Sequence, residues 1–300
     1  MFKGINIIEF TQKFPDKDSC YLYLEELKWG KGFRCSRCGH DQYYRGKHAF
    51  SRRCKNCKYE ESVTANTLFH GIKMSLLKAF HLTFRIAAKK KGMSTIELGN
   101  EVGIQQKSAW LFKRKVQVGM QSDKKKKIEA QVHVDEFVTG GPEKGKPGRS
   151  DGKKKKTLIM VEVRPGGKTG RVYCSLIADY TKATLYPIIE ATVAKDAKIV
   201  TDEYPSYDKL KEKFPKAIQS KSNAGRNFPV LHQQIMNMKG WLRGIHHQCS
   251  EKHYQKYLDE YCFRTNRRNT EQRIFKTIML RVVQSKTKTF KELVAIAHAA

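Results

Sequence analysis

Two Cys-x-x-Cys pairs constrain this chain more than any other feature of its sequence. Cys35 and Cys38 form the first pair, and Cys54 and Cys57 form the second after fifteen intervening residues. Each pair favours a tight turn, and four thiolates at this spacing can enclose one tetrahedral Zn²⁺ ion. The alternatives are a disulfide framework or free buried thiols, but nothing else in the chain is typical of a secreted protein. The sequence therefore predicts a zinc ribbon with a basic surface over residues 31–62.

The chain also carries a large excess of positive charge. Lysine and arginine total 59 against 29 acidic residues, which gives a net charge of +30. Such a surface repels itself unless a polyanion lies nearby, so double-stranded DNA is the expected partner; the alternative is a cationic surface that serves only solubility. The first residues lack the apolar run of a signal peptide, and no stretch approaches the ~18 apolar residues of a membrane span. We expect a cytoplasmic, nucleoid-associated protein with no membrane partner, in which the four remaining cysteines are reduced thiols.

A helix-turn-helix pattern follows the ribbon, after a predicted N-terminal helical segment at residues 1–30. Within residues 63–122, Ser94 is suited to cap a short helix, Gly103 provides a turn, and a second helix begins near Gln106. The residues expected to contact DNA are those at the start of the second helix and the basic pair within it, namely Gln105, Gln106, Lys107, Ser108, Lys113 and Arg114. The alternative is a helical hairpin that serves only packing.

Alternating apolar segments then predict a mixed α/β domain over residues 128–283, with a tail at 284–300. Three strands, a helix, another strand and later helices are the order expected of an RNase H-like domain. The polar segment between the first two strands is predicted to be a loop, and its last lysines, Lys153 to Lys156, suit a DNA backbone.

Two acids lie at strand positions in this domain. Asp135 falls within the first strand and Asp202 ends a later one. An acid in an apolar strand is unfavourable unless it is paired or binds a cation, so the two together suggest shared Mg²⁺ ions at a phosphodiester. Side chains alternate across a strand, so Glu136 is expected to face away from Asp135. The alternative for each aspartate is a turn cap or an ion pair with a lysine.

The chain closely resembles the zinc-ribbon transposases of insertion sequence family fifteen-ninety-five, the ISXO-two-like group. The resemblance runs from about residue 14 to 268, and it rests on several motifs together: FPDKDSCYLYLEELKW, the two cysteine pairs, SVTANTLFH, GMSTIELGNEVGIQQKSAW, VDEFVTGG, TDEYPSY, LRGIHH and YLDEYCFRTNRRN. The family implies an RNase H-like catalytic domain of the DDE type.

Carried over position by position, the resemblance implies that Asp135 and Asp202 are the first two catalytic acids. The third family position usually holds Glu and falls here on His232, which makes the triad D-D-H, and Lys239 matches the basic residue that follows it. His232 and Lys239 are seven residues apart and so share one helix face, which Arg243 extends toward DNA. Because imidazole binds Mg²⁺ less readily than carboxylate does, this triad favours Mn²⁺ as well. The alternative for His232 is a structural helix residue.

These features predict a transposase that binds terminal inverted repeats, nicks the element ends and joins the 3′-hydroxyl to target DNA by metal-dependent hydrolysis and transesterification. The expected cofactors are structural zinc and catalytic magnesium or manganese. Both ends react together, so a homodimer or larger assembly is expected. The rival hypothesis is a DNA-binding regulator that kept the ribbon and the helix pair but lost catalysis, and a nuclease of the same fold is a lesser alternative.

Overall fold

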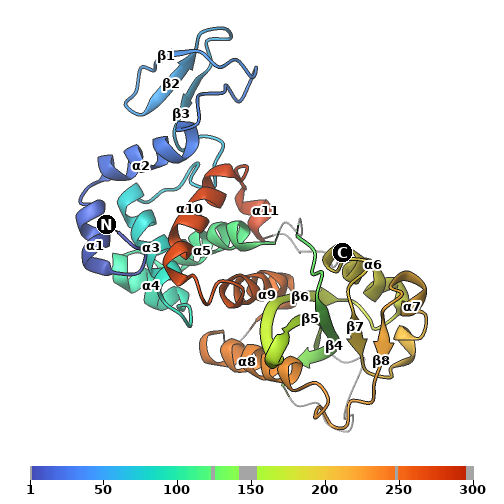
Figure 1. The fold of residues 1–300 in the computed structure, drawn as a ribbon. Coiled ribbons are helices and arrows are strands. Elements are labelled where there is room, and N and C mark those ends of the chain that lie inside the picture. The colour runs from blue at the N-terminus through green and yellow to red at the C-terminus, as the bar shows by residue number, and fades with distance from the viewer. Residues whose placement is uncertain (1, 123–125, 142–153, 247–248, 295–300) are drawn as a thin grey trace. The chain divides into compact units, whose positions relative to one another are not determined.

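The structure is a computed structural model of the 300-residue chain. It describes residues 2–122, 126–141, 154–246 and 249–294. The predicted loop between the first two strands of the α/β domain therefore lies, for residues 142–153, outside the described part of the chain. The chain divides into two compact units (Figure 1). One, the helical unit, comprises residues 1–120 with 267–295, and the other, the sheet unit, comprises residues 121–266.

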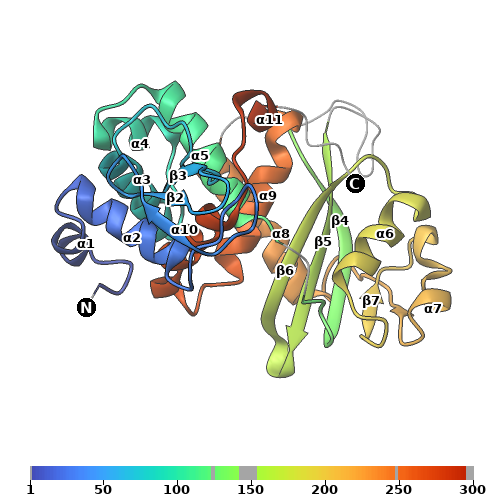
Figure 2. The same ribbon diagram turned by 90° about the horizontal axis from the view of Figure 1, so that it is seen from above.

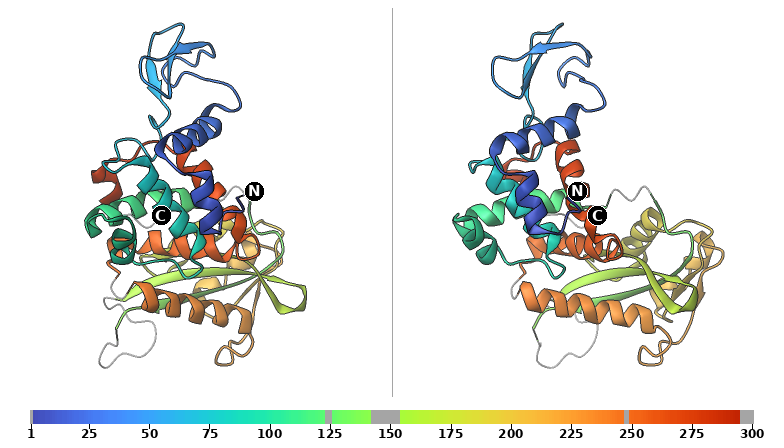
Figure 3. Two further views of the ribbon diagram at one scale, coloured as in Figure 1. Left: turned by 90° about the vertical axis from the view of Figure 1, so that its left-hand side faces the viewer. Right: turned by 60° about the vertical axis from the view of Figure 1, so that its left-hand side comes forward.

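The helical unit contains the ribbon strands and most of the helices. In chain order its elements are α1 (Ile7–Lys13), α2 (Lys17–Trp29), β1 (Tyr43–Arg45), β2 (Ser51–Cys54), β3 (Glu60–Ser62), α3 (Leu76–Ala88), α4 (Thr95–Val102), α5 (Gln106–Met120), a 3₁₀ turn (Glu271–Arg273), α10 (Ile274–Gln284) and α11 (Phe290–Val294). The three strands form an antiparallel sheet of their own (Figure 3).

Side-chain caps fix where the helices of this unit begin. Asp16 caps α2 by accepting from the Ser19 N–H, and the hydroxyls of Ser75 and Ser94 cap α3 and α4 in the same way. Gly103 ends α4 in the left-handed region, with φ of +61°, a conformation that glycine adopts without a Cβ penalty. The cap at Ser94, the turn at Gly103 and the helix start at Gln106 that the sequence predicts are confirmed.

An aromatic cluster forms the core of the helical unit. Phe10 and Phe84 stack with ring centres 4.4 Å apart, and Phe275 contacts both rings. Because Phe275 lies on α10, residues 267–283 belong to the helical unit and not to the α/β domain that was predicted to extend to residue 283. The predicted tail likewise contributes α11, whose Leu293 is buried. The domain boundary is thus corrected to residue 266.

The sheet unit is a five-stranded mixed sheet with helices on both faces (Figure 2). Its elements are β4 (Gln131–Thr139), β5 (Lys155–Arg164), a 3₁₀ turn (Pro165–Gly167), β6 (Lys168–Ile177), α6 (Lys182–Thr192), β7 (Ile199–Thr201), a 3₁₀ turn (Pro205–Tyr207), α7 (Leu210–Lys213), β8 (Ile218–Gln219), α8 (Pro229–Ile245) and α9 (Glu251–Thr265). The strand order is β6-β5-β4-β7-β8; the first three strands pair antiparallel, and β7 pairs in parallel with β4 and β8.

Each face of this sheet has its own hydrophobic core. On β4 and β5, Val132, Val134, Leu158 and Met160 belong to the core shared with α6 and α7. Phe137, like Ile159 and Val161 of β5, belongs to the core shared with α8 and α9. Strand alternation therefore assigns even positions of β4 and β5 to the α6 face and odd positions to the α8/α9 face.

No helix in the described ranges is long and apolar enough to cross a membrane.

Two ion pairs join α2 to the ribbon strands. The Lys28 ammonium lies 2.7 Å from the Glu61 carboxylate, and the two side chains are 12 % and 2 % exposed. Lys28 also donates to the carbonyls of Ser62 and Ala65, at 3.0 and 2.6 Å. Burial lowers the pKa of Lys28, and the Glu61 carboxylate opposes that change. This pair is far less hydrated than a surface salt bridge.

We expect Glu61→Gln to lower the free energy of unfolding by about 3 kcal/mol, because it leaves the Lys28 charge buried without its counter-ion. Glu25→Gln removes the other link, the Arg52–Glu25 pair at 3.1 Å, whose side chains are 15 % and 30 % exposed, and is expected to cost less than about 1 kcal/mol. Urea unfolding of the zinc-loaded chain measures both changes. Equal losses in the two variants would contradict the assignment of Lys28–Glu61 as the stronger link.

Candidate functional sites

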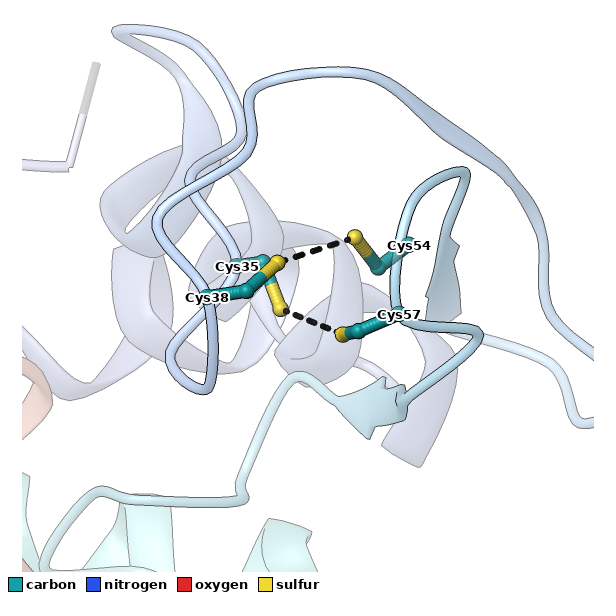
Figure 4. A group of neighbouring side chains, drawn as sticks. All are labelled: Cys35, Cys38, Cys54 and Cys57. Carbon is teal, nitrogen blue, oxygen red and sulfur yellow. Dashed lines mark hydrogen bonds between the residues drawn. The ribbon is translucent and has the colours of Figure 1, made fainter.

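The four cysteines of the two pairs form one compact site (Figure 4). The Cys35 and Cys57 sulfurs lie 3.6 Å apart, as do those of Cys38 and Cys54, and all four sulfurs lie within 4.8 Å of one another. Tetrahedral zinc with Zn–S bonds of about 2.3 Å requires sulfurs roughly 3.8 Å apart, so the spacing fits zinc. All eight cysteines of the chain are free of disulfides, which disfavours the alternative of a disulfide framework.

The electrostatics of these thiols also favour a bound cation. The His40 N–H, which donates to the sulfur, is the main cause of a Cys38 pKa lowered to about 6. For Cys57, the Tyr59 N–H acts in the same direction, but burial and the neighbouring thiols outweigh it and raise the pKa to about 11. Once one thiolate forms, its negative charge raises the pKa of the neighbouring thiols. A bound divalent cation offsets that charge and favours the thiolate form of all four.

The strand register of the sheet unit brings Asp135 and Asp202 together. β4 and β7 pair in parallel with Val134 opposite Thr201, and an aspartate follows each residue of this last pair. β7 ends at Thr201, and the Asp202 carboxylate accepts from the Tyr204 N–H at 3.2 Å. Neighbouring strands lie about 4.8 Å apart, and the charges of both carboxylates act on the pKa of one nearby residue, Tyr207. Two acids that are 67 positions apart in the chain therefore lie at one edge of the parallel β4–β7 pairing, where that pairing ends.

Glu136 and Tyr207 lie behind this edge, on the α6 face. Glu136 is 8 % exposed and accepts a short hydrogen bond from the Tyr207 hydroxyl. Burial raises the pKa of Tyr207 well above its usual value, and the charges of Glu136, Asp135 and Asp202 add to that effect. Tyr207 thus stays a neutral donor that compensates a buried carboxylate. No role for Tyr207 was predicted, because it lies in a 3₁₀ turn where strand alternation carries no information.

Lys239 lies on the same face of the sheet as Asp135. Its ammonium nitrogen is 5.4 Å from the centre of the Phe137 ring. Burial lowers the pKa of Lys239; the positive charges of Arg243 and Lys154 lower it further, whereas the Asp135 carboxylate raises it. Lys239 is therefore close enough to Asp135 for their charges to interact. Arg243, one helical turn further along α8, is exposed.

His232 lies in the first turns of α8, and its ring packs against Gly225. A Cβ at Gly225 would meet three atoms of the His232 ring at 2.9 to 3.1 Å. The Nε2 atom of His232 is buried and has no hydrogen-bond partner. An unpartnered imidazole nitrogen is available to a ligand, but the same ring also has a clear packing role against the loop that precedes α8.

Asp135, Asp202 and His232 do not form a close set of metal ligands in this structure. Within the described ranges, the only group of three or more Cys, His, Asp or Glu residues whose ligand atoms all lie within 4.8 Å is the cysteine site. Asp135 and Asp202 each follow a residue of the last β4–β7 pair, and His232 does not join them in so close a group. The D-D-H metal site stays a prediction.

In the helical unit, α4 and α5 form the pair of helices predicted from the sequence. The residues at the start of the second helix are all exposed, namely Gln105, Gln106, Lys107 and Ser108. Lys113 and Arg114 differ, since each is only 2 % exposed. The Lys113 ammonium donates to the Met93 carbonyl at 2.8 Å, and Arg114 donates to the Gln117 side chain at 2.8 Å. The prediction that these two contact DNA is corrected: Lys113 links α5 to the segment before α4, and Arg114 bonds within α5.

Comparison with known protein families agrees with this division of the chain. An ISXO2-like transposase domain matches residues 127–266, and a transposase zinc-ribbon domain matches residues 15–60. The first match covers most of the sheet unit, so the molecule joins a zinc ribbon to a DDE-type transposase domain. These two matches confirm the resemblance, seen in the motifs, to the ISXO2-like transposases that carry a zinc ribbon. No curated protein matches the chain.

Loss of one cysteine tests the zinc site. Cys54 is fully buried, and Cys54→Ser is expected to reduce bound zinc from about one ion per chain to a small fraction and to unfold the ribbon, because three thiolates hold the ion weakly. Metal analysis and hydrogen exchange of residues 43–62 measure the two effects. Cys249→Ser, outside the ribbon, is expected to leave both unchanged; zinc retained by Cys54→Ser would contradict the site.

The contact between Gly225 and His232 generates a second test. Gly225 has φ of +86° and no room for a side chain, so Gly225→Ala is expected to lower the free energy of unfolding by about 1–2 kcal/mol. Gly240→Ala is the matched control in α8, because no atom lies within 4 Å of its Cβ; it is expected to stabilise by up to about 1 kcal/mol. Thermal unfolding distinguishes the two, and a neutral Gly225→Ala would show that the ring does not pack there.

Proposed function

We propose that the chain is an active DNA transposase that cuts the ends of a mobile element and joins them to target DNA. The observation that supports the proposal is that Asp135 on β4 and Asp202 directly after β7 each follow a residue of the last pair between these two parallel strands, inside the domain that matches an ISXO2-like transposase. Carboxylates brought together from distant parts of a chain, with Lys239 nearby, suit chemistry on a phosphodiester.

The strand order supports an RNase H-like fold for this domain. Three antiparallel strands lie at one side of the sheet in the order β6-β5-β4, and two further strands add in parallel beyond β4. The first acid lies on the central strand, β4, and the second follows β7, its parallel neighbour. Asp135 lies within β4 at the point where the parallel pairing with β7 stops, and Asp202 lies at the carboxyl end of β7.

Asp135 and Asp202 would hold Mg²⁺ or Mn²⁺, with His232 as the third ligand that the resemblance implies. The donor set fits in part: two carboxylates offer the hard oxygens that these ions prefer, and His232 offers an unpartnered Nε2. When bound, such ions activate the attacking oxygen and stabilise the leaving oxygen. Tyr207 keeps Glu136 hydrogen-bonded behind the edge, so that Asp135 alone of the two neighbours faces the substrate.

Lys239 and Arg243 would bind the phosphates beside the reacting bond. Both lie on α8. The charges of Arg243 and Asp135 both affect the pKa of Lys239, so these groups lie close to one another. As an ammonium, Lys239 offers a positive charge beside the Asp135 carboxylate, which raises the Lys239 pKa against the effect of burial. It therefore binds the DNA backbone and helps to offset the negative charge of the transition state.

Recognition of the element's terminal inverted repeats is proposed for the ribbon and for α4 and α5 as a helix-turn-helix. At the start of α5, the exposed Gln105, Gln106, Lys107 and Ser108 are suited to reading base edges in the major groove. On the ribbon, the Tyr44 ring is 54 % exposed and has two lysine ammonium groups 5.2 and 5.6 Å from its centre. This combination of ring and charge suits contact with DNA.

Because two element ends must be processed together, the proposed active form is a homodimer or a larger assembly on DNA, working at the nucleoid in the cytoplasm. The rival function is a regulator that binds the same repeats without cutting. It is favoured by one observation, that His232 does not join the two aspartates in a close ligand set.

Neighbouring acids provide the test. Asp202→Asn is expected to reduce strand transfer on the order of 10²-fold or more while DNA binding persists, because the carboxylate acts on the reaction and not on affinity. Glu203→Gln alters the next residue, which is exposed, and should leave the rate nearly unchanged. The assay uses duplexes that end in the element's own repeats, with Mg²⁺ or Mn²⁺. Binding without any cutting by the wild-type chain would support the regulator, and cutting without preference for those ends would support a nuclease.

A further inference from the structure

Lys155 and Lys156 begin β5 and carry the same charge, but they lie on opposite faces of the sheet. Lys156 pairs with Val138 across the strands, and its ammonium lies over the Tyr180 ring at 5.3 Å and donates to the Ala178 carbonyl at 3.2 Å. Tyr180 belongs to the α6 core. Lys156 therefore points away from the face that Asp135 occupies.

Lys155 lies on the Asp135 face and is held there by a fixed aromatic ring. Its ammonium is 5.9 Å from the centre of the Tyr254 ring. Tyr254 comes from α9 and is 1 % exposed, and its oxygen accepts hydrogen bonds from Thr139 at 2.8 Å and Thr157 at 3.2 Å. Two strands thus anchor one ring, and a cation over the face of such a ring is favourably placed.

Lys155 and Lys239 extend from Asp135 as a row along β4. Asp135 comes first, Phe137 with the Lys239 ammonium over its ring is two residues further, and Thr139, the register partner of Lys155, is two residues beyond that. Two residues of strand span about 7 Å. The groups are therefore spaced on the same scale as successive phosphates of one DNA strand, each of which carries a negative charge.

From this row we infer that Lys155 is a phosphate-binding residue for the DNA strand whose reacting bond lies at Asp135. This inference rests on the proposed function and deepens it. Because Lys155 is about 13 Å along the strand from the register position of Asp135, it binds a phosphate beyond the one at Lys239, not the one that reacts. It is a positioning residue: it sets the path of the strand and takes no part in bond making.

The experiment compares the two adjacent lysines in the full zinc-loaded chain. Lysine acylation followed by mass spectrometry, with and without a DNA duplex that carries the terminal repeats, is expected to show Lys155 protected by DNA and Lys156 unchanged. In salt titrations of DNA binding, Lys155→Ala should reduce the slope of log affinity against log salt by about one, Lys155→Arg should restore it, and Lys156→Ala should leave it at the wild-type value.

Equal protection of the two lysines, protection of neither, or an unchanged slope in Lys155→Ala would overturn the inference. The readouts are binding measurements, so they do not depend on cutting. If the wild-type chain binds but does not cut, the transposase proposal fails while the contrast between Lys155 and Lys156 is still measured. If cutting is normal and the contrast is missing, only the role of Lys155 fails.

Discussion

The parallel pairing of β4 with β7 is the constraint on which the rest of the candidate site depends. Val134 opposite Thr201 fixes the register, and the next position on each chain segment is an aspartate. A shift of one residue would turn one carboxylate to the α6 face, where Val132 and Val134 already pack against an apolar core. The hydrophobic cores on the two faces therefore hold Asp135 on the α8/α9 side, so the packing of apolar residues determines the orientation of a polar group.

Several buried charges in the described part of the chain have close partners, although the net charge is +30. Lys113 is bonded to the Met93 carbonyl, Lys28 to Glu61, and Glu136 to the Tyr207 hydroxyl. Burying any of these charged groups without a partner would cost several kcal/mol, on the order expected for an unpaired buried charge. Positive residues thus serve two purposes here, because some hold elements together while the exposed ones are left for a polyanion. Sequence composition records only their sum.

The sequence predicts the zinc ribbon, the helix caps and the order of strands well, because each depends on local chemistry. Spacing identifies the four cysteines, and Ser75 and Ser94 mark where helices begin. Prediction from the sequence fails where contacts between residues far apart in the chain determine the structure. Lys113 is a basic residue of the kind that contacts DNA, but it is buried inside the helical unit. Phe275 lies far along the chain from Phe10, yet its ring packs against Phe10 in the core of that unit. The hydrogen bond from Tyr207 to Glu136 could not be predicted, because it depends on the fold that places the 3₁₀ turn next to β4.

Strand alternation turns a run of like residues into groups with different surroundings. In the sequence Lys155 and Lys156 are equivalent, and both suit a DNA backbone. In the sheet, one lies over the ring of Tyr254 on the Asp135 face and the other over the ring of Tyr180 on the opposite face. Since a DNA strand bound at Asp135 follows a single face, only one of the two can lie along it. On the proposed path, that strand would run from Asp135 past Lys239 to Lys155, the three groups that share this face.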